Sequence, residues 1–418
     1  MGRASVLAHS HPSPPIRPPN RRRTRWSVQC AKAEANHAMV DERAWSGDIT
    51  RREFLRRMGR AALVGGVPAL VTACTRQQSG GRSPAPAGSG GDGTSTGTLA
   101  PVAPGARTTV LTGTTDEGYV DPKPALGQRY DATRWTSTAS GDTSPICAEV
   151  GSDASPGVVI DWLGGLFLGR VPTTWTWDQA HSYGGAGIKS YSSGLTTYSY
   201  LRVHNIEDGI KPQQVEPNMG SWILHDSYFS AIRDDCIEDD DFMPGAVQDC
   251  LMDGVRAFIS EQNESRSLFA SIGPGESRFI DVARCYVRIH TANAGNDGPG
   301  YFFKWQGRGV QNHTPVIADS VFALAQEPAE GWDAAGFPPD AVFIGTNYVC
   351  WLGPGTYPGP APAAVTVLTG DQAYSMWTGV RNAWLTAHGM SSSSLPATVD
   401  PFLITHDARV PVPSPSSD

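Results

Sequence analysis

The side chains best suited to chemistry lie in one short acidic stretch, residues 233–241, which reads Arg-Asp-Asp-Cys-Ile-Glu-Asp-Asp-Asp. A second acidic pair, Glu207 and Asp208, precedes it, and Asp208 comes 26 residues before Asp234. Carboxylates that recur at such an interval and stack side by side repel one another, which raises the pKa of some of them or recruits a cation. Because a carboxyl group with a raised pKa is a general acid, the stretch predicts acid–base chemistry of the kind used on sugars.

Ca²⁺ is the cation that this stretch would recruit, because it prefers a shell of oxygen ligands that carboxylates supply. The three carboxylates that we expect to bind it are Asp235, Glu238 and Asp239. A bound Ca²⁺ would also bridge to the uronate groups of an acidic polysaccharide. The spacing of cysteines and histidines indicates no zinc site and no iron–sulfur cluster, so Ca²⁺ is the only cofactor that the sequence suggests.

A second pattern places a cation directly after an aliphatic residue in four places. The pairs are Ile210-Lys211, Ile232-Arg233, Val255-Arg256 and Val287-Arg288. If these segments stack, the aliphatic residues line a core and the cations form an outward ladder. Such a ladder would hold uronates through Lys211, Arg233 and Arg288, with Arg256 as the base of a β-elimination. The alternative is that the cations only neutralise neighbouring aspartates as surface ion pairs.

Tryptophans are the third candidate for sugar binding. Trp175 and Trp177 flank Thr176 in a turn-like context, where an exposed ring would stack on the face of a sugar. Buried packing is the alternative, because it is the usual role of large aromatic side chains.

The elements that must position these residues are short strands. Seven apolar runs end in Asp or Asn, at Asp161, Asn205, Asp226, Asp249, Asp281, Asp319 and Asn347. Two early intervals are 21 and 23 residues, and later ones stretch to about 28–38 residues, as inserted loops would cause. Short strands at this period predict a solenoid in which Asp or Asn at each bend satisfies freed backbone groups.

This periodic pattern resembles the right-handed parallel β-helix of the pectate-lyase-like superfamily over about Val158 to Trp384. We therefore expect an all-β, single-stranded right-handed parallel β-helix, preceded by a disordered leader and linker. Residues 107–157 and 385–410 would cap its ends. A β-sandwich or jelly roll is the rival, but neither has a recurring bend at the end of each strand.

A weaker resemblance concerns the site. Asp234-Asp235-Cys236 resembles the Gly-Asp-Asp-Cys element of polygalacturonase-type glycoside hydrolases, and Glu207-Asp208-Gly209 loosely resembles their Asn-Thr-Asp-Gly. The resemblance implies that Asp208, Asp234 and Asp235 are the acid–base carboxylates. The chain departs from the pattern in three places: Arg233 replaces Gly, Gly254-Val255-Arg256 stands where Gly-His-Gly is expected, and only Val287-Arg288-Ile289-His290 approaches Arg-Ile-Lys.

The N-terminal region carries addressing signals. Residues 50–56, Thr-Arg-Arg-Glu-Phe-Leu-Arg, and the short apolar run 61–70 resemble a twin-arginine export signal, with Arg51 and Arg52 as its arginines. Val71-Thr72-Ala73-Cys74 resembles a bacterial lipobox, which implies lipidation of Cys74. We therefore expect export by the twin-arginine translocase to the outer face of the cytoplasmic membrane, held only by a lipid anchor, or release outside the cell. Met39 would give a more usual length of leader.

Composition divides the chain in the same way. Residues 1–74 are the predicted signal, 75–106 a flexible Gly/Ser/Pro linker, and 107–410 the β-helix domain. The net charge of −8 is the sum of +8 over residues 1–73 (13 Lys+Arg, 5 Asp+Glu) and −16 over residues 74–418 (20 against 36). An acidic body argues against nucleic-acid binding, which needs a basic face.

Five of the seven cysteines, Cys147, Cys236, Cys250, Cys285 and Cys350, lie in this body. An odd number leaves at least one unpaired, and twin-arginine substrates fold before export in a reducing compartment. We expect these thiols to be small buried residues with at most one disulfide.

Two functional classes remain open. The protein is either an enzyme, a lyase or hydrolase acting on an acidic polysaccharide, or a non-catalytic β-helix that binds glycan or a cell-wall partner. Convergence of Asp208, Asp234 and Asp235 in a groove with an aromatic wall favours the enzyme. Pairing of each carboxylate with Lys211, Arg233 or Arg256 favours the binding protein.

Overall fold

The structure is a computed structural model that describes residues 107–139, 146–172, 174–215, 220–261, 279–290, 300–305, 312–328, 331 and 336–390. Arg51, Arg52, Cys74 and the predicted linker 75–106 lie outside the described residues. No helix in the described ranges is long and apolar enough to cross a membrane.

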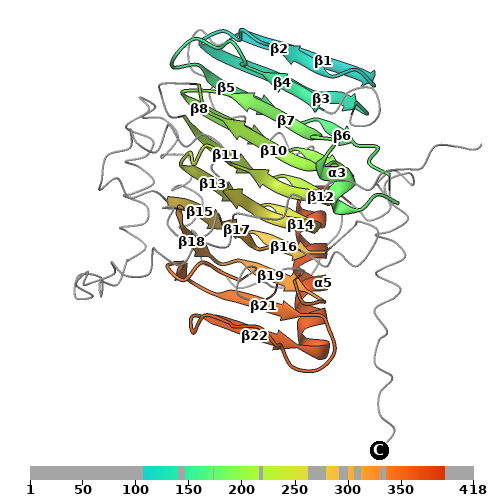
Figure 1. Ribbon diagram of the computed structural model, residues 1–418, viewed down its shortest axis with the longest axis vertical. Coiled ribbons are helices and arrows are strands. Elements are labelled where there is room, and N and C mark those ends of the chain that lie inside the picture. Colours follow the sequence, from blue (N-terminus) through green and yellow to red (C-terminus); the bar gives the residue numbers. More distant parts are fainter. Residues whose placement is uncertain are drawn as a thin grey trace, which may run out of the picture. The chain divides into compact units, whose positions relative to one another are not determined.

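The described residues wind into three ladders of parallel strands (Figure 1). Ladder 1 consists of β1 Arg107–Thr115, β3 Gly127–Ser137, β5 Val159–Leu163, β8 Leu195–Ser199, β11 Ser221–His225, β13 Gly245–Gln248, β15 Phe279–Ala283, β18 Thr314–Ala318 and β20 Val342–Ile344. Ladder 2 runs from the end of β3 through β6 Leu166–Leu168, β9 Arg202–His204, the first parts of β12 Tyr228–Glu238 and β14 Leu251–Glu261, then β16 Tyr286–Ile289, β19 Val321–Leu324, β21 Asn347–Trp351 and β22 Val365–Thr369. Ladder 3 contains β2 Tyr119–Asp121, β4 Ile146–Val150, β7 Ala186–Tyr191, β10 Asp208–Gln213, the later parts of β12 and β14, and β17 Phe303–Trp305.

Because successive strands fall in ladder 3, then 1, then 2, each turn of the chain stacks on the previous one. The winding is right-handed, so the domain is the right-handed parallel β-helix that the strand period predicts. The parallel pairing excludes the rival β-sandwich, whose sheets are antiparallel.

Bends between ladders 1 and 2 stack along the helix and explain part of the Asp/Asn pattern. Asp226, Asp249 and Asp319 have positive φ of 50°, 51° and 49° there, and Asn205 has 53° at another bend. Asp and Asn tolerate this left-handed conformation better than most residues do, which confirms these four predicted bends. Asn347 begins β21 directly after a bend, where its side chain accepts from the Ser320 N–H and donates to the Ile344 carbonyl, as predicted. The prediction is wrong for Asp161 and Asp281, which lie inside β5 and β15.

The predicted caps need correction at both ends. Residues 107–157 already form coils, since β1 pairs with β3, and β2 with β4, in parallel register. These strands were missed because their buried residues, such as Tyr130, Ala132 and Trp135, alternate with polar ones instead of forming aliphatic runs. At the other end the strands finish at Thr369 and an 18-residue helix, α5 Gly370–Ala387, follows; residues 391–410 are not among those described.

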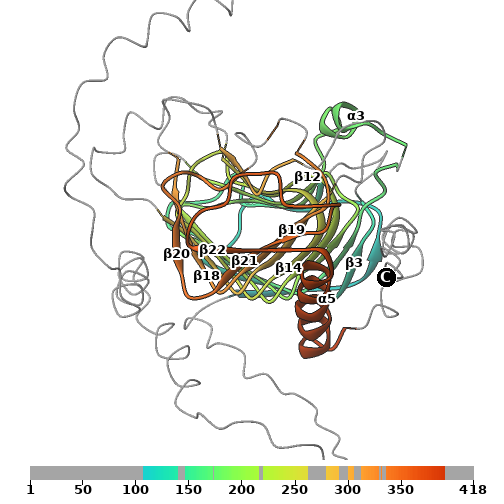
Figure 2. The same ribbon diagram turned by 90° about the horizontal axis from the view of Figure 1, so that it is seen from below.

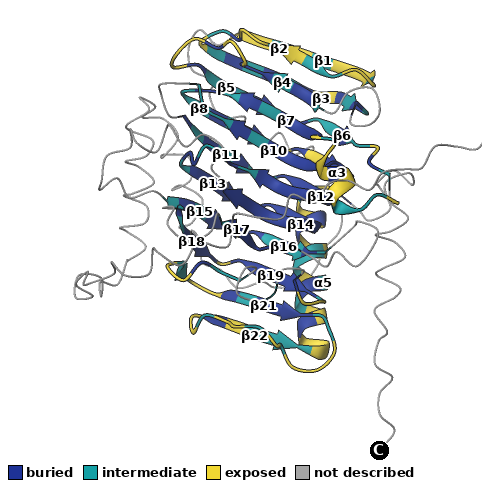
Figure 3. Cartoon of the chain, in the orientation of Figure 1, coloured by how far each residue is buried: buried dark blue, intermediate teal, exposed yellow. Residues whose placement is uncertain are grey.

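Residues are more buried in the middle of the stack of coils than at its two ends. Strands in the middle are buried along their length, whereas β1, β2 and β22 at the two ends carry exposed residues (Figure 3). The aliphatic residues of the four predicted aliphatic–cation pairs, Ile210, Ile232, Val255 and Val287, are fully buried, as predicted. The five predicted body cysteines are buried and form no disulfide bond among the described residues, as expected of small buried thiols.

Two helices lie outside the coils (Figure 2). The long helix α5 packs through Trp377, Trp384 and Leu385 against ladder 2 residues such as Tyr228 and Leu251. The short helix α3, Trp177–His181, packs against β12. Each helix brings a histidine to a different side chain cluster.

Candidate functional site

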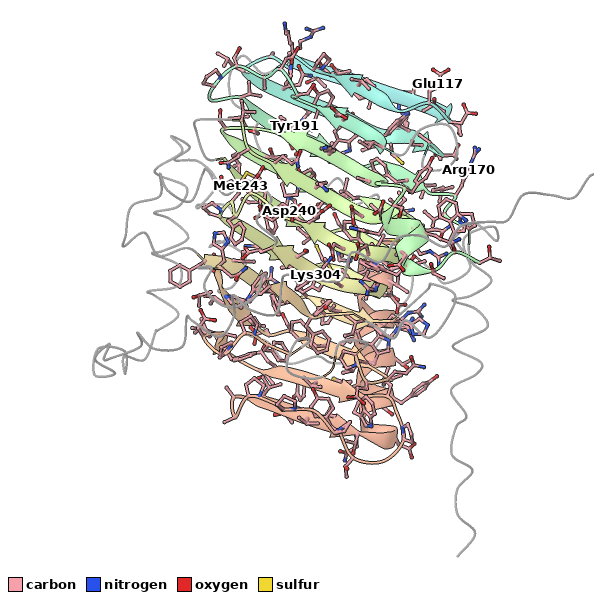
Figure 4. All side chains as sticks on the ribbon, viewed as in Figure 1. Glu117, Arg170, Tyr191, Asp240, Met243 and Lys304 are labelled. Carbon is pink, nitrogen blue, oxygen red and sulfur yellow. The ribbon has the colours of Figure 1, made fainter. Side chains whose placement is uncertain are left out.

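Ladder 3 brings distant parts of the chain together at the middle of the stack. Glu238 of β12 lies beside Ser260 of β14, and Ser260 lies beside Lys304 of β17. From this position the Lys304 side chain reaches Asp235, 69 residues earlier in the chain. Figure 4 labels Lys304 at this level of the stack. We call the side chains that meet here the carboxylate–lysine cluster. It consists of Glu207, Asp208, Asp234, Asp235, Glu238, Lys211, Arg256 and Lys304.

Asp234 is the most heavily contacted carboxylate of this cluster. Its Oδ1 lies 3.1 Å from an Arg256 guanidinium nitrogen and 3.4 Å from Lys304 Nζ, and its Oδ2 lies 2.9 Å from His181 Nδ1. Burial alone would raise the pKa of Asp234, but the contacts with His181, Lys304 and Arg256 outweigh burial and lower the pKa to about 2. Asp234 is therefore ionised at neutral pH.

The neighbouring Asp235 behaves in the opposite way. Its Oδ2 accepts a hydrogen bond from Lys304 at 2.9 Å, and its backbone N–H donates to Asp208 Oδ1 at 3.2 Å. Its Oδ1 is buried and has no hydrogen-bond partner among the described residues. Burial, and next the negative charge of Asp234, raise the pKa of Asp235 to about 7, although Lys304 opposes this. Two adjacent carboxyl groups thus have pKa values on either side of the usual range.

Three further acids complete the cluster. Glu207 accepts a hydrogen bond from the Gly185 backbone N–H, and burial is the main reason that its pKa is raised to about 9. Burial and the nearby Glu238 raise the pKa of Asp208 well above its usual value. Glu238 instead pairs with Lys211 at 2.5 Å, and a hydrogen bond from Asp208 and this cation lower its pKa against the effect of burial. At neutral pH the cluster therefore holds neutral and ionised acids side by side.

Helix α3 supplies the side of the cluster that faces solvent. Its first turn is fixed by a capping box, in which the Thr176 side chain accepts from the Gln179 N–H and the Gln179 side chain accepts from the Thr176 N–H. One turn apart, Trp177 and His181 stack with ring centroids 4.7 Å apart. The Arg256 guanidinium lies 4.4 Å from the Trp177 ring centroid, which is a cation–π contact. The His181 side chain is 54% exposed, against 2% for Asp234, so His181 gives the cluster its contact with water.

The structure therefore brings together most residues singled out in the sequence. The predicted acids Asp208, Asp234 and Asp235 converge, with one oxygen of each within 4.8 Å of the others. Arg256 and Trp177 lie beside them. Each of the two expected outcomes is met only in part: the acids converge beside an aromatic ring but are buried, and among the described ion pairs Asp234 pairs with Arg256 whereas Asp235 pairs with Lys304.

The predicted ladder of four cations is wrong. Lys211 aligns with Lys189, not with an arginine. Arg233 is buried, and its guanidinium donates to Asn205 Oδ1. Arg288 lies on ladder 2, where it pairs with Asp253 at 2.6 Å. Left-handed bends inside β12 and β14, at Ala231 and Gly254, divide each long strand between two ladders, so equal spacing in sequence does not give equal position in space.

Two other groups of predicted residues are also separated. Trp175 packs against Tyr183, with ring centroids 5.6 Å apart. The three predicted Ca²⁺ ligands have different neighbours: Asp235 contacts Lys304, Glu238 contacts Lys211, and Asp239 accepts from Trp222 Nε1 at 2.9 Å near Glu261 and His313. The structure does not gather Asp235, Glu238 and Asp239 around one point.

Sequence reasoning missed His181 and Lys304. His181 comes from helix α3 outside the coils, and Lys304 comes from β17, a coil strand that no apolar run ending in Asp or Asn marks in the sequence, so the spacing argument reaches neither. The one available signal for Lys304 was its rarity, since the chain has only five lysines, at positions 32, 123, 189, 211 and 304. For His181 it was the sequence Thr-Trp-Asp-Gln, residues 176–179, which fits a helix N-terminus with a capping box.

Comparison with known proteins adds no relative: no family model, no curated protein and no solved structure matches this chain. The site is interpreted below from its own geometry. The chain belongs to the class of right-handed parallel β-helices, with a buried carboxylate–lysine cluster on one ladder.

Proposed function

We propose that the protein is a carbohydrate-active enzyme that hydrolyses glycosidic bonds in an acidic polysaccharide. One observation carries the proposal: Asp234 and Asp235 are adjacent and buried, yet the pKa of the first is lowered to about 2 and that of the second is raised to about 7. Pairs of carboxyl groups whose surroundings push their pKa values apart are the usual basis for one acid and one ionised group in a glycosidase.

The charges of the site favour an anionic substrate. A pKa of about 9 keeps Glu207 neutral at pH 7 and one of about 7 leaves Asp235 half-protonated, whereas Asp234 and Glu238 are ionised; burial raises the pKa of Asp208 as well. The cations of the cluster are Lys211, Arg256 and Lys304, and the pKa of His181 at its solvent edge is raised by the hydrogen bond to Asp234. Three cations therefore face five carboxyl groups, of which Glu207 is neutral and Asp235 half-protonated at pH 7, so the cluster carries less negative charge than its sequence suggests, although the protein as a whole is acidic. This local balance of charge would favour the binding of uronate groups.

Hydrolysis fits the cluster better than β-elimination does. Elimination needs a base that removes a proton from carbon, and Lys304 or Arg256 would have to supply it. Burial would lower the pKa of Lys304, but Asp235 and Asp234 outweigh burial and raise it, so Lys304 keeps its proton. Arg256 is committed to Asp234 and to the Trp177 ring. The groups that can exchange a proton near neutral pH are Asp235 and His181, which suits acid–base hydrolysis.

The proposed roles follow from these contacts. Asp235, in its neutral form, donates its proton to the glycosidic oxygen as the bond to the sugar carbon breaks. His181, held by Asp234 and open to solvent, takes a proton from the water whose oxygen bonds to that carbon. Trp177 stacks on a sugar ring beside them. The resemblance of Asp234-Asp235-Cys236 to polygalacturonase-type hydrolases supports Asp235 as an acid–base carboxylate, while Val255 stands where those enzymes carry histidine.

A non-catalytic glycan-binding β-helix is the second candidate, and one observation favours it. Both oxygens of Asp234 are already engaged by protein cations, which is the arrangement of a structural ion network. In that case the acids hold the coils together and a glycan binds elsewhere. Substitution of Asp235 distinguishes the two, because a structural carboxyl changes stability without changing turnover.

Export and lipid anchoring are part of the proposal. The twin-arginine motif at Arg51 and Arg52 and the lipobox at Cys74 support a protein tethered to the outer face of the cytoplasmic membrane. A mature N-terminus at Cys74 carrying a diacylglycerol group, measured by mass spectrometry of the membrane fraction, is the expected result. An unmodified N-terminus elsewhere would contradict the anchor.

The test of the activity is a screen of uronate-containing polysaccharides with and without Ca²⁺, in which both reducing ends and unsaturated products are measured. We expect reducing ends without unsaturated product, and a loss of at least about 100-fold in Asp235→Asn, the usual scale for a removed general acid. Asp161→Asn is the matched control, because Asp161 is a strand carboxylate that pairs with Arg129 away from the cluster. No turnover on any substrate, or equal turnover in Asp235→Asn, would contradict the hydrolase; unsaturated product would replace it with a lyase.

A further inference from the structure

A second histidine–carboxylate cluster lies on the opposite flank of the coils, where the bends between ladders 1 and 2 stack beside helix α5. Asp226 and Asp249 occupy the same bend position on adjacent coils, and the Asp226 N–H donates to the Gln248 carbonyl as the two bends stack. His388, directly after α5, brings its imidazole to them. None of these residues belongs to the carboxylate–lysine cluster.

The three side chains are close enough to share one ion. One oxygen of Asp226, one oxygen of Asp249 and one ring nitrogen of His388 lie within 4.8 Å of one another. His388 Nε2 is 3.3 Å from Asp226 Oδ1. With metal–ligand bonds of about 2.0–2.1 Å, two ligands of a tetrahedral ion are roughly 3.3–3.4 Å apart, so this pair already has the spacing of a tetrahedral edge.

The orientation of His388 is fixed by atoms outside the cluster. Its Nδ1 lies 2.9 Å from the Trp384 carbonyl oxygen, and a ring nitrogen facing a carbonyl must carry the proton. The ring also stacks on the Trp384 indole, with centroids 3.8 Å apart and planes inclined by 15°. A neutral His388 therefore points the lone pair of Nε2 at the carboxylates. This is the arrangement in which metal-binding histidines are held.

The carboxylates are positioned as well. The second oxygen of Asp226 contacts His225 Nδ1 at 2.6 Å, and Trp384 Nε1 donates to the Asp249 carbonyl at 3.1 Å. No lysine or arginine of the described coils forms an ion pair with Asp226 or Asp249. A protonated His388 would hydrogen-bond Asp226 alone, whereas a dication would bond to all three ligands.

We propose that Asp226, Asp249 and His388 bind a divalent transition-metal ion, with water in the fourth position. The imidazole selects such an ion over Ca²⁺ or Mg²⁺, which prefer oxygen ligands alone. The three ligands come from two coils and from the end of α5, so the bound ion clamps the last helix to the β-helix. The half-buried position, with side-chain exposures of 26% for Asp226 and 14% for His388, leaves the site open to an ion from solvent.

The probe is Zn²⁺, added to the full chain after treatment with EDTA. Isothermal titration calorimetry is expected to show one equivalent that is weakened at least tenfold in His388→Gln and in Asp249→Asn, and Zn²⁺ is expected to raise the melting temperature of the wild type only. Co²⁺ in the same site is expected to give the visible absorption of a tetrahedral ion. Asp249→Asn is the second variant in case His388→Gln fails to fold, because Asn also tolerates the left-handed bend.

His181→Gln is the matched control, since His181 makes an equivalent contact with Asp234 in a cluster already filled by cations. It is expected to bind Zn²⁺ like the wild type. Absence of Zn²⁺ binding, or binding that is the same in wild type, His388→Gln and Asp249→Asn, would overturn the site. Because the readout is metal binding, it is independent of the proposed hydrolase activity.

Discussion

Two regions of the molecule carry the same three side chains in different surroundings. The α3 trio consists of Trp177, His181 and Asp234, and the α5 trio consists of Trp384, His388 and Asp226. In both, a histidine four residues after a tryptophan stacks on the indole and bonds an aspartate of the coils.

The difference lies in the neighbours of the aspartate. Asp234 is buried and also contacts Lys304 and Arg256, so its charge is neutralised by the protein. Asp226 is half-exposed and has only histidines as cationic partners among the described residues. In our proposals the same trio therefore takes part in proton transfer where lysine and arginine are supplied, and binds a metal ion where they are not. The neighbours on adjacent coils, and not the trio itself, decide the chemistry.

The largest expected effect comes from removing the cation that distinguishes the α3 trio. Lys304→Met leaves Asp234 and Asp235 buried without their shared ammonium group, and breaking a buried ion pair from one side costs about 3–5 kcal/mol of unfolding free energy. Urea denaturation measures the loss. Lys189→Met is the control: this half-buried lysine of ladder 3 lies 5.3 Å from the Tyr191 ring centroid, so we expect about 1 kcal/mol or less. Equal losses in the two variants would show that Lys304 is an ordinary surface cation.

The next largest effect is a difference in stability between variants of the two tryptophans, Trp384 and Trp177. Trp384 is 3% exposed, packs near Tyr228 and donates to the Asp249 carbonyl, so Trp384→Leu should cost about 2–4 kcal/mol. Trp177 is only half-buried on a short helix, so Trp177→Leu should cost less than about 1 kcal/mol while lowering turnover of the polysaccharide. Denaturant midpoints and initial rates for both variants check the contrast. A large loss of stability in Trp177→Leu would mean that α3 is structural.

The sequence predicted the fold and the acids better than their partners. The bend residues Asp226 and Asp249 and the buried Ile232 and Val255 follow from a period of one coil, which is a local property. Lys304 could not be placed, because its contact with Asp235 depends on the register of three coils and on the length of the inserted segments.

The contacts of the two histidines could not be predicted from the sequence either. His181 and His388 sit on or beside helices that leave the coil period, and the sequence alone does not say which coil a helix packs against. Arg233 and Arg256 both follow a buried aliphatic residue, yet one is bound to Asn205 and the other to Asp234. Their partners depend on the register of neighbouring coils and were beyond prediction.

The pH dependence of stability should have opposite signs on the two flanks. Asp235 has a pKa of about 7 in the folded protein against an ordinary value of 3.8, so between these values the folded state retains a proton that the unfolded chain releases. Its contribution to stability is present below about pH 4 and is lost as the pH rises to 7. Asp253, paired with Arg288 and with Arg381 of α5, has its pKa lowered to about 2 despite burial, so its contribution is present above pH 4 and is lost as the pH falls to 2.

Chemical denaturation at a series of pH values separates the contributions of Asp235 and Asp253 to stability. Asp235→Asn should make the decline in stability between pH 4 and 7 shallower, and Asp253→Asn should make the decline below pH 4 shallower. Each variant serves as the control for the other, because the two windows do not overlap. An unchanged slope between pH 4 and 7 in Asp235→Asn would mean that Asp235 is ionised in the folded protein, and would remove it as the general acid.

The smallest effect tests how α3 holds its histidine. Thr176→Ala removes the side-chain half of the capping box, and loss of an N-cap costs about 1 kcal/mol of local helix stability. Because the helix has only one turn beyond its cap, the change should appear as local opening, with amide exchange at Gln179 and Ala180 faster by roughly fivefold and global unfolding nearly unchanged. Thr176→Ser keeps the capping oxygen and should restore slow exchange. If turnover falls with the faster exchange in Thr176→Ala and returns in Thr176→Ser, His181 acts through its fixed position over Asp234. If Thr176→Ala speeds amide exchange but leaves turnover unchanged, the α3 trio is a surface contact. The α3 and α5 trios then differ less than the residues around them indicate.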